Sequence, residues 1–106
     1  FKEWRNIREL YLGYTNVTDK GLAHLKDCKT FIELNLTGTK VSNEGLANFR
    51  DCKNLELLSL RNTEITDEGL KHIETIPALK KLYLTDSKVT AAGVKQLQGV
   101  LPNCAI

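Results

Sequence analysis

One pattern of residues recurs every 24 positions along this chain without a gap. Its most regular column holds leucine in every copy: Leu10, Leu34, Leu58 and Leu82. Another column holds glycine: Gly21, Gly45, Gly69 and Gly93. A period of about 20–50 residues is typical of a solenoid, in which each copy is a small unit that buries its apolar face against the next copy. We therefore predict a stacked repeat fold for the whole chain.

Each copy is predicted to form a strand, a turn and a short helix. In the first copy, segment 9–12 alternates polar or aromatic residues with leucine, which is the period of a strand with one buried face. Thr18 stands where a helix would begin, and its hydroxyl is expected to cap the first turn. Asp19 follows, where a negative charge suits the positive end of a helix. Leu22 and Leu25 then share one helical face.

Stacking these units places the strands side by side in a parallel sheet, with the helices behind it. Because a helix is about 10 Å wide and strands lie about 4.8 Å apart, the stack is expected to curve with its sheet on the concave face. The predicted fold is an α/β right-handed solenoid. The glycine column is expected to permit a close approach between neighbouring repeats. A column of hydroxyl residues at the turn is expected to bond loop amides: Thr15, Thr39, Thr63 and Ser87.

The chain is predicted to be a single solenoid over residues 1–106. The repeats are expected at 7–30, 31–54, 55–78 and 79–102, with 103–106 as the C-terminal end. Phe1 and Trp4 fall 24 residues before Leu25 and Cys28, so residues 1–6 are interpreted as the tail of a preceding repeat or as a cap. If the first strand is an uncovered edge, we expect self-association through it.

Composition argues against several classes of function. The net charge is only +2, from 15 basic and 13 acidic residues, which gives no support to nucleic-acid or membrane binding. The apolar runs are too short to span a membrane. The sequence holds no Ser/His/Asp arrangement, no Cys/His cluster with metal spacing and no glycine-rich phosphate loop. We therefore expect no catalytic activity, no cofactor and no bound metal.

Two cysteines occupy one core column in adjacent repeats. Cys28 and Cys52 are expected to be buried free thiols that pack as small apolar groups, with a disulfide as the alternative. Buried free thiols would favour a cytoplasmic location over an oxidising compartment.

The repeat itself is similar to that of a known family. Residues 7–25 and 55–73 follow LxxLxLxxT and then (V/I)-T-D-x-G-L-x-x-L, with Ile or Leu at the apolar ends. This pattern resembles the leucine-rich repeat family, and in particular its cysteine-containing or bacterial-type subclass. The turn column holds Thr or Ser where the family has Asn or Cys, the 24-residue period is short, and no F-box is present. The resemblance implies a protein-binding scaffold and names no ligand.

Specificity is expected where the repeats differ, on the outward positions of the strands and the turns beyond them. The candidate partner-binding residues are Glu9, Tyr11, Tyr14, Glu33, Asn35, Leu57, Ser59, Arg61, Lys81 and Tyr83. Tyrosine and arginine are typical anchors of protein interfaces. Tyr11, Leu57, Arg61 and Tyr83 are predicted to anchor a protein partner.

The leading hypothesis for function is a non-catalytic protein-interaction module, interpreted as a fragment of a larger protein. One alternative is a structural or self-assembling segment of a repeat array. Another is the regulatory arm of a multidomain enzyme or of a ubiquitin-ligase-type adaptor.

Overall fold

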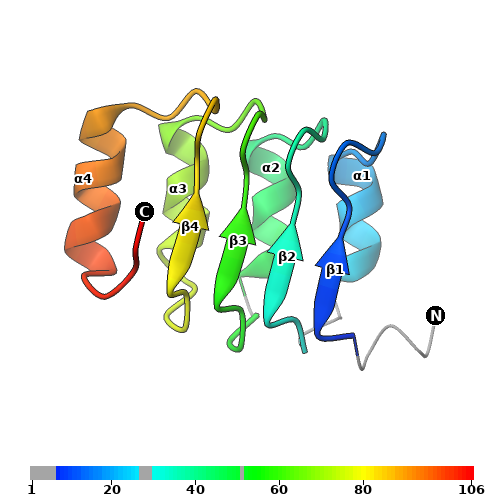
Figure 1. Cartoon of the computed structure of the whole chain (residues 1–106), viewed down its shortest axis with the longest axis horizontal. Coiled ribbons are helices and arrows are strands. Elements are labelled where there is room, and N and C mark those ends of the chain that lie inside the picture. The colour runs from blue at the N-terminus through cyan, green and yellow to red at the C-terminus, as the bar shows by residue number, and fades with distance from the viewer. Residues whose placement is uncertain (1–6, 27–29, 51) are drawn as a thin grey trace.

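The computed structural model describes residues 7–26, 30–50 and 52–106 and shows a parallel sheet with helices on one of its faces (Figure 1). The strands are β1 (Glu9–Tyr11), β2 (Glu33–Asn35), β3 (Leu57–Ser59) and β4 (Lys81–Tyr83). The helices are α1 (Asp19–Leu22), η2 (Ala23–Leu25), α2 (Asn43–Leu46), η3 (Ala47–Phe49), α3 (Asp67–Ile73) and α4 (Ala91–Val100), where η2 and η3 are 3-10 turns that continue α1 and α2. The predicted tail or cap at residues 1–6 lies outside the described residues.

The strands are hydrogen-bonded in the order β1-β2-β3-β4, and each neighbouring pair is parallel. The register steps by one repeat, so that Leu10 pairs with Leu34, Leu34 with Leu58, and Leu58 with Leu82. In Figure 1 helices α1 to α3 lie behind the sheet, and α4 lies to the left of β4. Each next strand lies to the left of the one before it, so the crossovers through α1 to α3 are right-handed. The structure therefore confirms the predicted α/β solenoid of strand, turn and helix.

The apolar core lies between the sheet and the helices, and the middle of the stack is its most deeply buried part. Leu34 and Leu58 are fully buried, whereas Leu10 in β1 is only half-buried. Val17 and Val89 of the outer repeats are also half-buried against the core. Stacking on both sides is therefore what closes the core, because a repeat at either end has a neighbour on one side only.

The two edges of the sheet differ. At the β4 edge, the N–H of Ala105 donates to the carbonyl of Lys80, and the N–H of Leu82 donates to the carbonyl of Ala105, both at 2.8 Å. Helix α4 ends before Pro102, as the sequence predicts, and this lets the chain return to cover the edge. No strand among the described residues pairs with the outer edge of β1. Self-association through β1 stays a prediction.

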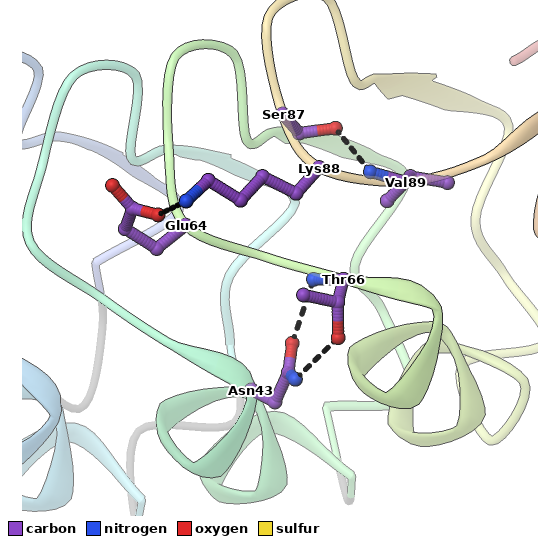
Figure 2. Close-up of polar contacts among 6 residues, drawn as sticks. All are labelled: Asn43, Glu64, Thr66, Ser87, Lys88 and Val89. Carbon is purple, nitrogen blue, oxygen red and sulfur yellow. Dashed lines mark hydrogen bonds and ion pairs between the residues drawn. The ribbon is translucent and has the colours of Figure 1, made fainter.

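The hydroxyl column at the turns is present, but its main partners are carbonyls. Each hydroxyl donates at 2.7 Å to the carbonyl three residues before it, in Thr15, Thr39, Thr63 and Ser87 alike. Ser87 also accepts a longer bond of 3.4 Å from the N–H of Val89 (Figure 2). Thr15 likewise accepts from the N–H of Val17 at 3.5 Å, so the expected amide partners are found for two of the four residues. The carbonyl that each hydroxyl contacts belongs to the leucine that directly follows the strand.

Neighbouring repeats are joined by a polar clamp at the start of each helix. Asn43 accepts a hydrogen bond from the N–H of Thr66 at 3.0 Å and donates one to its hydroxyl at 2.7 Å (Figure 2). Asp67 accepts from both groups of Thr90, at 2.8 Å and 2.5 Å. Asp19 accepts from the same two groups of Ser42. We call each of these pairings a repeat clamp.

The clamps correct two expectations about the helix starts. Asp19 was expected only to complement the helix dipole, yet its carboxylate is bonded to the next repeat. Thr18 occupies the N-cap position as predicted, but its hydroxyl makes no cap bond. In the later repeats Thr66 accepts from the N–H of Glu68 and Thr90 from that of Gly93. In these two repeats the hydroxyl residue therefore takes part in a clamp and also caps its own helix, whereas Ser42 takes part in a clamp without a cap bond.

The clamps also explain three of the four residues in the glycine column, where a close approach between repeats was predicted. A Cβ added at Gly69 would lie 2.5 Å from Oδ1 of Asn43. Gly45 and Gly93 face Asp19 and Asp67 in the same way, at contacts that are shorter still. Every side chain larger than hydrogen would therefore displace the residue that forms the clamp.

The clamp at Asp67 makes stability depend on pH. The hydroxyl of Thr90, followed by its N–H, lowers the pKa of the Asp67 carboxyl. The ionised Asp67 carboxylate therefore stabilises the folded state fully above the pKa of the carboxyl in the unfolded chain, about 4. This stabilisation is lost as the pH falls through the lower pKa of Asp67 in the folded state. We expect Asp67→Asn, which imitates Asn43, to fold normally and to lose less stability than the wild type below about pH 4.

Urea unfolding between pH 2 and pH 7 would measure this effect. Glu68→Gln is the matched control, because Glu68 is exposed on the same helical turn and pairs only with Lys71 among the described residues, at 3.6 Å. An acid-induced loss that is identical in Asp67→Asn and Glu68→Gln would contradict the clamp's contribution.

Candidate functional site

The helices cover one side of the sheet and leave the other side open, and we call this open side the sheet face (Figure 1). Two rows of outward side chains run across it in register. The first row is Glu9, Glu33, Leu57 and Lys81, and the second is Tyr11, Asn35, Ser59 and Tyr83. These two rows hold eight of the ten predicted binding residues, and Arg61, which contacts Tyr83, is the ninth on this face. Tyr14 lies in the turn beyond β1.

The β1–β2 end of the sheet face is acidic. Glu9 and Glu33 lie side by side in register, and the hydroxyl of Tyr11 is 2.8 Å from Glu33 and 3.0 Å from Glu9. The hydrogen bond to Glu33, followed by that to Glu9, raises the pKa of Tyr11 to about 12. The phenol therefore keeps its proton at neutral pH and remains a hydrogen-bond donor to this end of the face.

The β3–β4 end of the sheet face is basic. The guanidinium of Arg61 lies 4.3 Å from the centre of the Tyr83 ring, which is a cation–π contact. Lys81 is exposed on the same strand as Tyr83. Neither Arg61 nor Lys81 forms an ion pair with another described residue, whereas neighbouring Lys80 pairs with Glu56 at 3.3 Å. Two cations are thus available to a partner at this end.

The middle of the sheet face is less polar and partly closed. Leu57 is half-buried between Glu33 and Lys81. Ser59 was expected to be an outward contact residue, but it is only 4% exposed and its hydroxyl lies 2.7 Å from that of Thr37. Asn35 accepts from the N–H of Thr37 at 2.9 Å. Ser59 is therefore too deeply buried to serve as a contact residue.

The turns beyond the strands share a left-handed backbone conformation that the sequence analysis did not foresee. The residues at this column have positive φ angles of 58°, 68°, 55° and 61° in Tyr14, Gly38, Asn62 and Asp86 respectively. Glycine, asparagine and aspartate tolerate this region best, and their recurrence in one column was the available signal. Tyr14 is the exception: it is 76% exposed, and its ring lies where a Cβ of Gly38 would be.

The described part of the chain lacks the features of two other kinds of site. No group of three His, Cys, Asp or Glu side chains there could hold a metal ion. None of the described helices combines the length and apolar character required to cross a bilayer. Cys52 is buried in the core, but Cys28 lies outside the described residues, so their pairing stays open. Burial raises the pKa of the Cys104 thiol.

Comparisons with known proteins agree with this architecture. Residues 5–25, 27–49 and 51–73 each match the family model described as a leucine-rich repeat. The structure is similar to that of the leiomodin-1 actin-binding site 2, with a TM-score of 0.72 at 11% identity over 97% of this chain and 70% of that one. It is also similar to a leucine-rich repeat protein of Leptospira interrogans, with a TM-score of 0.55 at 21% identity over 96% of this chain and 37% of that one. No curated protein matches the sequence.

Proposed function

This chain belongs to the leucine-rich repeat family, a general protein-interaction module, and from that premise we propose that it binds a protein partner on the sheet face without catalysing a reaction. The observation that supports the proposal is a set of aromatic, apolar and arginine side chains on the sheet face, of which Tyr11 and Arg61 are exposed and Leu57 and Tyr83 are half-buried. Tyr11 is 59% exposed, and Arg61 is stacked on Tyr83 with its N–H donors directed to no described carboxylate. Ordered aromatic and arginine side chains lose little conformational freedom on binding.

The test is the simultaneous replacement of Tyr11, Leu57, Arg61 and Tyr83 by alanine. Hot-spot residues each contribute about 1–2 kcal/mol or more, so we expect at least a tenfold loss of affinity for a natural protein partner. Capture of partners from the source cells with the wild-type chain, followed by titration of one purified partner, would measure the loss. An unchanged affinity would show that the sheet face is not the binding surface.

The matched control replaces four exposed residues on the helix side by alanine: Glu68, Lys71, Lys95 and Gln96. This variant also removes four side chains but leaves the sheet face intact, and we expect it to bind as the wild type does. Circular dichroism of both variants would show that the solenoid is still folded.

The edges of the sheet favour one second candidate function. The outer edge of β1 has no strand partner among the described residues, whereas Ala105 covers the edge of β4. A segment that extends or joins repeat arrays through β1 would use this asymmetry. A molecular mass that stays monomeric at high concentration in sedimentation would argue against self-assembly.

A regulatory arm of an enzyme or of a ubiquitin-ligase-type adaptor would still use the sheet face proposed here.

A further inference from the structure

Resting on the proposed function, we propose that the sheet face binds an extended polypeptide segment that crosses the strands, with cationic side chains over β1 and β2 and anionic side chains over β4. The segment carries an apolar side chain between them, over Leu57. The partner is thus defined by its order of charges as well as by its composition.

The charges on the face are separated by sign along the stack. Glu9 and Glu33 are both on the first two strands, and Tyr11 holds its hydroxyl between them. Lys81 is the first residue of β4, and Arg61 follows β3 and contacts Tyr83 of β4. A ligand of uniform charge is attracted at one end and repelled at the other, so a nucleic acid or an anionic membrane is a poor match.

The width of the face fits a short segment. Three strand spacings of about 4.8 Å separate β1 from β4, which gives about 14 Å. An extended chain rises about 3.3 Å per residue, so about four residues separate the first cation from the anion. The order along the segment is therefore cation, then an apolar residue, then an anion about four to five residues after the first cation.

The area of the face also favours a segment over a second copy of this chain. Four strands of three residues cover about 19 Å by 10 Å, or about 200 Å². A stable dimer buries about 800 Å² on each partner, several times this area. An extended segment of about six residues spans the same 19 Å and can instead be held by the sheet face alone, with modest affinity.

Two synthetic peptides of identical composition test the order of charges. The bipolar peptide is Gly-Lys-Lys-Ser-Leu-Ser-Glu-Glu-Gly, and the mixed peptide is Gly-Lys-Glu-Ser-Leu-Ser-Lys-Glu-Gly. Each is titrated into isotopically labelled wild-type protein, and the amide shifts of β1–β4 are followed by NMR. We expect the bipolar peptide to bind about threefold to tenfold more tightly, with an advantage that shrinks as salt is added. Equal affinities, or shifts confined to the helix side, would overturn the proposal.

Charge-neutralising variants give a second readout. Glu9→Gln with Glu33→Gln is expected to abolish the advantage of the bipolar peptide. Glu44→Gln with Glu68→Gln changes the net charge by the same amount on exposed positions of α2 and α3, and is expected to preserve that advantage. An equal loss in both double variants would overturn the proposal, because the effect would then come from net charge alone. A rise in molecular mass without peptide, lost in the first variant, would also overturn it in favour of a second copy.

The failure of this inference is distinguishable from the failure of the proposed function. If the two peptides bind equally but the four-alanine variant still loses its natural protein partner, the order of charges is wrong and the sheet face remains the binding surface. If the four-alanine variant keeps its partner, the proposed function and this inference are both wrong.

Discussion

Replacing Phe31 by alanine is expected to lower the free energy of unfolding by about 3–5 kcal/mol. Phe31 and Phe49 are both fully buried, and their rings meet edge to face with centres 6.5 Å apart and planes at 72°. The two rings fill the second repeat, which is packed on both sides. A cavity there cannot be relieved by solvent, and a domain of this size has only about 5–15 kcal/mol of stability in total.

Urea denaturation followed by circular dichroism would measure this loss. Phe31→Leu is the matched control and is expected to cost less, because it keeps most of the apolar volume. A double-mutant cycle with Phe49→Leu isolates the ring contact, which is expected to contribute about 0.5–1.5 kcal/mol. A loss below about 1 kcal/mol for Phe31→Ala would contradict the packing described above.

Replacing Gly69 by alanine is expected to cost about 2–4 kcal/mol, which is opposite in sign to the usual effect of this change in a helix. The new methyl group would lie 2.5 Å from Oδ1 of Asn43 and 3.0 Å from Cγ2 of Ile65. Asn43 would have to leave the position from which it holds Thr66, so both bonds of the clamp would be lost with it.

The same chain offers a control and a rescue for this experiment. Gly99→Ala places a methyl group in a helix where nothing lies within 4 Å, and is expected to be neutral or to stabilise by up to about 1 kcal/mol. In the background of Asn43→Ala, Gly69→Ala is expected to cost much less, because the atom that it displaces is gone. Strict additivity of the Gly69 and Asn43 substitutions would show that the glycine is required for another reason.

The repeat period was sufficient to predict the solenoid, because apolar columns of fixed spacing leave few other ways to bury leucine. Side-chain contacts between repeats were less accessible. Asp19 and Asn43 stand at helix starts, where a local role explains them fully, so the sequence alone favoured that role. The signal for the clamp was present as an Asp or Asn followed 23 residues later by Ser or Thr, a spacing that has meaning only once the repeats are stacked.

The sheet face could be located from the sequence, since outward positions follow from strand alternation and strand register. The exposure of each individual residue on the sheet face could not be predicted from the sequence. Ser59 is only 4% exposed, and the partner of its hydroxyl, Thr37, lies 22 positions away in the sequence. The contact between Arg61 and Tyr83 likewise depends on rotamers, which a column of residue types does not specify.

Several core leucine and valine side chains of the outer repeats are only half-buried, and this determines where the fold opens locally. Local opening begins where the fewest apolar contacts must be broken, which here means the first and last repeats and not the middle of the stack. Those two repeats also carry the tyrosines at either end of the sheet face, Tyr11 and Tyr83. We therefore expect a ligand that contacts both tyrosines to stabilise the first and last repeats together, and to slow amide exchange at positions that it does not touch.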